Sequence, residues 1–240
     1  MSHVLDTTTP HRQEQRGRMI LYHSLSARSF RPLWALEELG LEYELKILPF
    51  PPRALDRSFL AINPLGTVPA LVTAEGLMTE SVAMCQYIAD RHGESRLTIA
   101  PADPVYGAYL NWMFYGEATL TFPQTLVLRY GRFEPQERRN PQVAEDYQRW
   151  FLSRLKFLVP QVSQHPYLCG ERFTLADISV GYALMLAWYQ GLETAFPPEV
   201  VTYWKTLQDR PAYRRALAIE AQAARDQGVS DLPSPLIQPG

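Results

Sequence analysis

Glu80 and Ser81, at the start of a predicted helix, carry the most suggestive chemistry in the sequence. The free N–H groups and the dipole of a helix N-terminus attract an anion, and a serine hydroxyl there can donate to a carboxylate. The carboxylate of Glu80 can bind an ammonium group. Because an α-amino acid carries both charges on one carbon, the pair would suit the amino-acid end of a ligand. Simple capping of the helix is the alternative.

Pro69 opens a short apolar strand, "PALV", although proline lacks an N–H and is normally kept out of paired strands. A cis bond between Val68 and Pro69 would turn the chain sharply into the strand. The N–H and C=O of Val68 would then be free to pair with an extended peptide, as an added strand does. A trans proline in an edge turn is the alternative.

The elements that must position these residues follow from the period of the apolar side chains. A strand is predicted at 19–23, a helix at 31–40 and an alternating strand at 43–48. "PALV" and "LMT" flank "TAEG" and predict a hairpin, and a helix follows at 81–93. This order, β-α-β and then β-β-α, indicates a small α/β domain whose first two strands are parallel.

The domain boundaries follow from changes in composition along the chain. Residues 94–103 contain two prolines and are predicted to link an α/β domain at 19–93 to an all-helical domain at 104–226. Residues 1–18 are expected to be a disordered extension, and the proline-rich segment 227–240 a flexible tail.

The second domain is predicted to contain helices only. Thr174 and Asp177 form a Thr-x-x-Asp capping box before an apolar run, which we interpret as a folding determinant. The predicted helices span 104–130, 142–159, 174–190, 198–209 and 211–226.

Composition argues against several classes of function. The 240 residues are 46% apolar, enough for a substantial core, and a net charge of −2 without a basic face disfavours a nucleic-acid partner. The apolar runs are too short to span a membrane, and the first residues lack the apolar core of a signal peptide. Cys85, Cys169 and the histidines show no metal-ligand or disulfide spacing, so we expect no metal and a reducing, cytoplasmic location.

Several of these motifs together resemble the cytosolic glutathione S-transferase family, in particular its bacterial, serine-type or theta-like members. "NPLGTVPALV" and "MTES" are similar to its glutathione-binding motif, "LYHSLSARSFRPLWALEELGLEYEL" to its first strand, loop and helix, and "YLCGERFTLADISVGYAL" to a late helical signature. The resemblance covers the chain from Met19 to about Arg225. It implies a thioredoxin-like N-terminal domain with a cis-proline, an all-α C-terminal domain and a homodimer.

The resemblance also implies which residues bind glutathione. Val68 would pair with the cysteinyl part of glutathione, Pro69 would be the cis-proline, and Glu80 and Ser81 would hold the γ-glutamyl group. Many relatives carry Lys or Gln where this chain has Thr67. The glycyl carboxylate would therefore be held weakly or by another group, for which the candidates are Arg53 and Arg57.

A transferase must lower the pKa of the glutathione thiol, which is about 8.5 in a free thiol. One hydroxyl donor to an anion contributes about 1.5–3 kcal/mol, enough for a shift of one to two units. Ser24, four residues before Arg28, is the first candidate donor and Ser26 the second. Relatives with Ser-Arg-Ser carry a hydroxyl where this chain has Ala27, so it is also open that neither serine acts.

The second substrate would lie against the first helix of the C-terminal domain. Trp112, Tyr115, Gly116 and Thr119 fall on neighbouring turns there and predict a pocket for an apolar electrophile, with Gly116 leaving space over the thiol. Core packing of the aromatic residues is the alternative.

These observations predict a glutathione transferase that joins the glutathione thiolate to a hydrophobic electrophile. A glutathione-dependent isomerase, ether-cleaving lyase or disulfide reductase on the same scaffold is one alternative, disfavoured by the absence of Cys from the loop. A non-catalytic glutathione-binding module is another.

Overall fold

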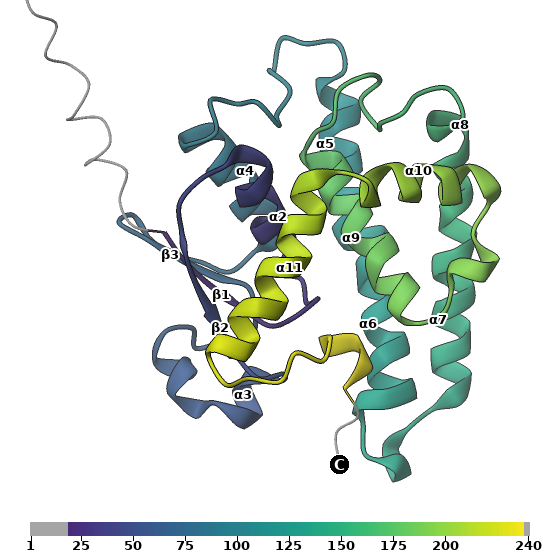
Figure 1. The fold of residues 1–240 in the computed structure, drawn as a ribbon. Coiled ribbons are helices and arrows are strands. Elements are labelled where there is room, and N and C mark those ends of the chain that lie inside the picture. Colours follow the sequence, from purple (N-terminus) through teal and green to yellow (C-terminus); the bar gives the residue numbers. More distant parts are fainter. Residues whose placement is uncertain (1–18, 238–240) are drawn as a thin grey trace, which may run out of the picture.

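A computed structural model describes residues 19–237, so the predicted disorder of 1–18 lies outside the described residues. The N-terminal domain contains a four-stranded mixed sheet in the order β2-β1-β3-β4 (Figure 1). Strand β1 pairs in parallel with β2 and antiparallel with β3, and β3 pairs antiparallel with β4. The strands are β1 (Ile20–His23), β2 (Glu44–Ile47), β3 (Ala70–Thr73) and β4 (Gly76–Met78).

Two long helices of this domain pack against each other, α2 (Phe30–Leu39) and α4 (Ser81–Arg91). Helix α2 also contacts α9 and α11 of the second domain, and eight of its ten side chains are buried. It ends at Gly40, which adopts a left-handed φ of 64° that favours glycine. The short helices α3 (Pro52–Leu55) and η1 (Arg57–Ala61) precede β3. The predicted β-α-β, β-β-α order is confirmed.

The C-terminal domain is helical, as predicted, but the first predicted helix at 104–130 is interrupted by π-helical turns. The predicted helix at 142–159 also ends early, at Arg154; a 3-10 turn follows, and Val159 begins a new short helix whose first turn contains Pro160. In chain order the elements are α5 (Tyr106–Phe114), η2 (Tyr115–Thr121), α6 (Phe122–Leu128), η3 (Arg129–Phe133), η4 (Gln136–Arg138), α7 (Pro141–Arg154), η5 (Leu155–Phe157), α8 (Val159–Val162), α9 (Leu175–Tyr189), η6 (Glu193–Ala195), α10 (Pro198–Gln208) and α11 (Pro211–Asp226).

Helix α9 lies at the centre of this domain and is apolar on all sides, as expected of a helix surrounded by others (Figure 1). Its N-terminus has the predicted capping box: the Thr174 hydroxyl accepts from the Ala176 N–H, and the Asp177 carboxylate accepts from the Thr174 N–H at 2.9 Å. Asp177 is fully buried and also accepts from the Leu168 N–H and the Tyr203 hydroxyl, both at 2.9 Å. The carboxylate therefore joins three segments of the domain.

The tail after α11 is packed against both domains up to Ile237, whereas the sequence led us to expect a flexible segment. The Gln227 side chain accepts from the Ile47 N–H and donates to the Leu45 carbonyl of edge strand β2. The short turn η7 (Ser234–Leu236) then follows, and the Ser234 N–H donates to the Leu25 carbonyl at 2.8 Å. Figure 1 shows the tail, in yellow, running from α11 toward the lower end of α6.

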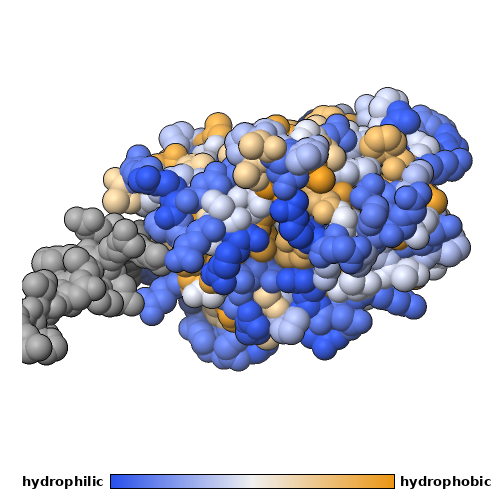
Figure 2. Space-filling view, turned by 90° about the horizontal axis from the view of Figure 1, so that it is seen from above, coloured by the Kyte–Doolittle hydropathy of each residue, from blue (hydrophilic) through white to orange (hydrophobic). Residues whose placement is uncertain are grey.

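The face seen from above in Figure 2 is mainly hydrophilic, with apolar residues in small scattered groups. Within residues 19–237 no helix is both long and apolar enough to span a bilayer. The same part of the chain contains no cluster of His, Cys, Asp and Glu arranged to hold a metal ion.

Candidate functional site

Val68 presents a free backbone beside a cis peptide bond. The Val68–Pro69 bond is cis, as predicted, and the ladder between β1 and β3 begins only at Ala70. Among the described residues, no group pairs with the N–H or C=O of Val68. The edge geometry proposed from the sequence is therefore present: one residue with both backbone groups available to an extended ligand.

Two residues that the sequence analysis did not single out fix the approach to Val68. Asn63 is fully buried, and its amide donates to the Thr67 carbonyl at 2.8 Å while its oxygen accepts from the Leu65 N–H. Gly66 has a φ of +60°, and a Cβ there would lie 2.6 Å from the Cβ of Arg53. A side chain at Gly66 would thus collide with α3, which places exposed Arg53 against this loop. The sequence pattern Asn-Pro-x-Gly could have identified Asn63 and Gly66 as the residues that shape this loop.

Glu80 and Ser81 lie at the first turn of α4. Glu80 is the N-cap residue of α4, but it is exposed and its side chain makes no capping hydrogen bond. Ser81 is buried, and its Oγ accepts a hydrogen bond from the Arg31 guanidinium at 3.1 Å. Because no described acceptor takes the hydroxyl proton, Ser81 can still donate to a ligand carboxylate.

Arg31 is a fully buried guanidinium directly behind Ser81. It pairs with the Glu117 carboxylate, donates to Thr121 Oγ1 at 2.6 Å, and lies 4.3 Å from the centre of the Tyr182 ring. Its partners come from η2 and α9, so the guanidinium joins the two domains underneath the start of α4. A buried charge is tolerated only when it is paired and hydrogen-bonded in this way.

Glu117 is shared between two arginines. It accepts from the Arg28 Nε at 2.8 Å in addition to Arg31, so two positive charges meet one negative charge. Burial alone would raise the pKa of the Glu117 carboxyl, but Arg31 and Arg28 hold it below its usual value. The carboxylate therefore stays ionised and balances one of the two guanidinium charges. The missed sequence signal was Arg31 near the start of a helix whose other first-turn residues are apolar.

The loop serines are buried, and their hydroxyl groups are already bonded. Ser24 is 1% exposed, and its hydroxyl donates to the Leu48 carbonyl at 2.9 Å. Ser29 binds the backbone of Ser24 through its own hydroxyl. The structure thus places Ser24 at the end of β1, next to the loop that follows β2.

Ser26 is held by a carboxylate from the C-terminal domain. It is fully buried with a left-handed φ of 54°, and both its N–H and its hydroxyl donate to Glu220, at 2.9 and 3.0 Å. Glu220 also accepts from Nε2 of buried His23 at 2.8 Å. A hydroxyl that is bonded to a carboxylate is poorly placed to stabilise a second anion, so this geometry favours Ser24 over Ser26.

The residues predicted to form the electrophile pocket lie inside the helical domain. The Trp112 ring packs on Tyr115 and Phe157, and the Tyr115 hydroxyl donates to the Arg154 carbonyl. A Cβ at Gly116 would lie 2.4 Å from the Oγ of Ser179, so this glycine permits close contact with α9 rather than leaving space over a thiol. Thr119 is half-buried on the same turn, η2. The contacts of Trp112, Tyr115 and Gly116 are thus with one another and with Phe157, Arg154 and α9.

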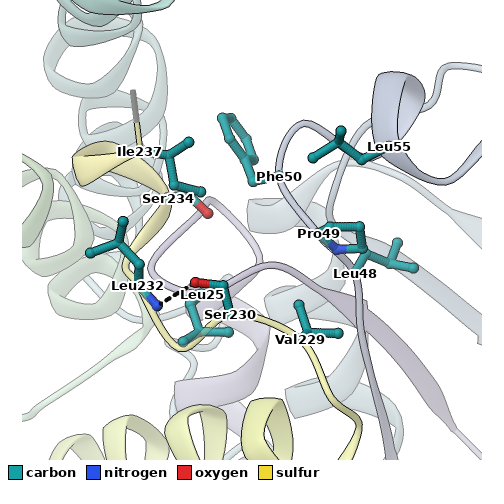
Figure 3. A pocket seen from close by; sticks show the side chains of 10 residues that line it. All are labelled: Leu25, Leu48, Pro49, Phe50, Leu55, Val229, Ser230, Leu232, Ser234 and Ile237. Atoms are coloured by element: carbon teal, nitrogen blue, oxygen red, sulfur yellow. Dashed lines mark hydrogen bonds between the residues drawn. The ribbon is translucent and has the colours of Figure 1, made fainter. Parts of the chain in front are cut away.

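An apolar cavity of about 270 Å³ lies instead between the serine loop, the loop after β2 and the C-terminal tail (Figure 3). A second cis peptide bond, Phe50–Pro51, lies in its wall and was not anticipated. The cavity is lined mainly by apolar side chains, among them Leu25, Leu48, Phe50, Leu55, Leu232 and Ile237.

Both cysteines are buried, and their surroundings keep their thiols protonated. Cys85 is fully buried, which raises the pKa of its thiol to about 12, and burial raises the pKa of the Cys169 thiol to about 11. Neither side chain provides a thiolate at neutral pH.

Comparison with known proteins identifies matches over both domains. The family models "Glutathione S-transferase, N-terminal domain" and "Glutathione S-transferase, C-terminal domain" match residues 25–91 and 124–211. Glutathione S-transferase 3 of Zea mays is 28% identical over 81% of this chain and 90% of its own length. A glutathione transferase structure from Methylococcus capsulatus superposes with a TM-score of 0.76 and 25% identity, covering 85% and 99% of the two chains. A sphingomonad glutathione S-transferase complexed with glutathione superposes with a TM-score of 0.73 and 26% identity, covering 84% and 98%.

Proposed function

The chain belongs to the glutathione S-transferase family, and from that premise we propose that it binds glutathione and joins its thiolate to a hydrophobic electrophile. The proposal rests on two observations: the unpaired backbone of Val68 next to a cis bond, and the Ser81 hydroxyl, which accepts a hydrogen bond from buried Arg31. The sphingomonad relative, whose structure contains glutathione, supports the same ligand here.

Each part of glutathione has a matching group in this arrangement. The cysteinyl N–H and C=O pair with Val68, as in strand addition. The γ-glutamyl carboxylate accepts from Ser81 and the free N–H groups of α4, and its ammonium binds Glu80. The glycyl carboxylate lies toward Arg53, which is exposed beside Gly66 and carries the positive charge that Thr67 lacks.

Ser24 is the proposed donor to the thiolate. It follows β1 directly, and its hydroxyl now donates to a neutral carbonyl, that of Leu48. A rotation about the Cα–Cβ bond would exchange that acceptor for the sulfur anion, and hydrogen bonds to charged acceptors are the stronger kind. The thiolate would then face the apolar cavity lined by Leu25 and Leu48.

A titration of enzyme-bound glutathione by thiolate absorbance tests the catalytic part of this proposal. A transferase should lower the pKa of the bound thiol below the value of about 8.5 for a free thiol. An unshifted thiol pKa, together with tight glutathione binding, would contradict catalysis while leaving binding intact.

A non-catalytic glutathione-binding module is the second candidate, and the state of the serine hydroxyls favours it. Ser24 and Ser26 are both bonded to groups of the protein and almost fully buried, so neither is already directed at a ligand. The same titration separates the two functions, because a module of this kind would bind glutathione without ionising it.

A homodimer is the proposed assembly. Phe122 and Trp150 are 54% and 51% exposed, and they line a surface hollow of about 450 Å³ between α6 and α7. Exposed aromatic side chains at such a hollow mark interaction surfaces. Sedimentation at micromolar concentration should show twice the 27.4 kDa chain mass, and Phe122→Glu should shift it to the monomer. A wild-type monomer would contradict the dimer.

We also propose that the protein is located in a reducing cytoplasm, because Cys85 and Cys169 are buried and form no disulfide.

A further inference from the structure

Helix α11 carries a buried carboxylate within a series of small residues. Ala212, Ala216 and Ala224 are buried at multiples of four residues along this helix. Glu220 takes the remaining place in the series and is only 3% exposed. The helix contacts α2 and β2 of the N-terminal domain (Figure 1). An alanine at 220 would continue the series, and a buried carboxylate is costly unless it is hydrogen-bonded, so the partners of Glu220 indicate its role.

The Glu220 carboxylate binds the chain on both sides of Ser24. Its Oε2 accepts from the His23 Nε2 at 2.8 Å and from the Ser26 N–H at 2.9 Å. Its Oε1 accepts from the Ser26 hydroxyl at 3.0 Å. His23 directly precedes Ser24, and Ser26 follows it two positions later. One side chain of the C-terminal domain therefore anchors both flanks of the proposed thiolate donor.

Both flanks depend on this carboxylate for their conformation. Ser26 has a φ of 54°, a left-handed conformation that residues other than glycine keep only where their surroundings impose it. The ring of His23 is fully buried, and its Nδ1 has no hydrogen-bond partner among the described residues. Within residues 19–237, Glu220 is thus the hydrogen-bonding partner that orients this ring. Loss of its contacts would release the turn at Ser26 and the ring of His23 together.

We propose that Glu220 is a positioning residue that holds Ser24 where its hydroxyl can reach the glutathione thiolate. This inference rests on the proposed function of Ser24 and deepens it. The Ser24 hydroxyl donates to the Leu48 carbonyl at 2.9 Å, and its redirection to sulfur requires a backbone that stays in place. A donor stabilises a developing anion most when its position is fixed in advance. Glu220 supplies that fixed position from the opposite domain.

Two substitutions separate the geometry of Glu220 from its charge. Glu220→Asp keeps the charge but withdraws the carboxylate by about 1.5 Å, the length of one C–C bond, which takes the contacts with His23 and Ser26 beyond hydrogen-bonding distance. Glu220→Gln removes the charge but keeps the reach. Its amide oxygen can accept from the His23 ring and the Ser26 N–H, and its NH2 group can donate to the Ser26 hydroxyl. That hydroxyl can then donate to the Tyr189 hydroxyl, 3.2 Å away.

The readout is the thiol pKa of bound glutathione, titrated by thiolate absorbance. Glu220→Asp should raise this pKa from the wild-type value toward about 8.5 and slow turnover below pH 7 by up to about tenfold, with glutathione affinity unchanged. Glu220→Gln should leave the thiol pKa at or below the wild-type value, because it keeps the contacts and removes a negative charge that opposes a thiolate. The double variant Ser24→Ala/Glu220→Asp should titrate as Ser24→Ala alone, because Glu220 acts through Ser24.

Arg210→Met is the matched control for contact between the domains. Arg210 precedes α11, about 15 Å along the helix from Glu220, and donates to the Glu38 carboxylate of α2 at 2.6 and 2.7 Å. Its replacement should lower the melting temperature and leave the thiol pKa unchanged. Hydrogen exchange of the Ser26 amide in wild type is a second test, which does not depend on whether Glu220→Asp folds. This amide should be protected, and rapid exchange would overturn the proposal.

The outcomes separate this inference from the proposed function. A thiol pKa that rises in Glu220→Asp but not in Glu220→Gln supports the assignment. Equal effects of the two substitutions, no effect of either, additive effects in the double variant, or an equal rise in Arg210→Met would overturn it. If the wild-type thiol already titrates near the free value of about 8.5, the proposed catalysis fails and this inference fails with it. If the wild-type value is lower and only Ser24→Ala moves it, the inference alone fails.

Discussion

Replacing Ser24 with alanine removes the hydroxyl that we propose as the thiolate donor, and the structure sets the size of the effect. In the ligand-free chain this hydroxyl donates to the neutral Leu48 carbonyl at 2.9 Å. A neutral hydrogen bond contributes about 0.5–1.5 kcal/mol and one to a charged acceptor about 1.5–3 kcal/mol. Because one bond is exchanged for the other, the net stabilisation of the thiolate is about 1–1.5 kcal/mol, or about one unit of thiol pKa.

The assay is a titration of bound glutathione by thiolate absorbance, together with turnover as a function of pH. Wild type should ionise the thiol about one unit below the free value of about 8.5, and Ser24→Ala should return it toward that value. Turnover of the variant should therefore be about tenfold lower below pH 7, and the gap should narrow above about pH 8.5, where both proteins hold the thiolate.

Glutathione affinity should change little in Ser24→Ala, because Val68, Glu80 and Ser81 make the proposed contacts with the peptide. Ser29→Ala, which alters a buried hydroxyl of the same loop, is the matched control for packing. Equal thiol pKa values in wild type and Ser24→Ala would refute the assignment. A loss of turnover that is the same at every pH would also refute it, because it would show a structural rather than an ionisation effect.

Three other substitutions test separate parts of the structure. Glu80→Ala should weaken glutathione binding without lowering the melting temperature, since the side chain makes no capping bond; unchanged affinity would remove Glu80 from the site. Gly116→Ala should destabilise the protein by about 1–3 kcal/mol through overpacking against α9, whereas Gly107→Ala, with open space around it, should be neutral or stabilising in urea unfolding. Asp177→Ala should cost about 2–4 kcal/mol, because it leaves buried donors without an acceptor. Burial raises the pKa of Asp177 from 3.8 to about 6, so its protonation stabilises the fold most below pH 3.8 and that contribution is lost as the pH rises to about 6. The free energy of unfolding of wild type relative to Asp177→Asn should accordingly fall over that interval; a constant difference would contradict the shifted pKa.

Local signals in the sequence were sufficient for the fold and for the helix start at Ser81. Alternating and helical periodicity placed the strands and helices, and the capping box placed the start of α9 because its hydrogen bonds join Thr174 and Asp177, three residues apart. The Glu80–Ser81 helix start was predicted for the same reason, and the cis Val68–Pro69 bond from the resemblance of the surrounding motif to a known family. Each depends on residues that are close together in the chain.

The remaining features depend on residues that are far apart in sequence, and only tertiary packing decides them. Arg31 and Glu117 are separated by 86 positions, and Ser26 and Glu220 by 194. Neither pair can be recognised from a local sequence pattern, because the partner of a buried polar or charged group can lie on any element that packs against it. The tail is the clearest case: its proline-rich composition predicted flexibility, but contacts with Leu25 and β2 make it a wall of the cavity. Its position follows from which surface it can bury, and that surface exists only once both domains have folded together.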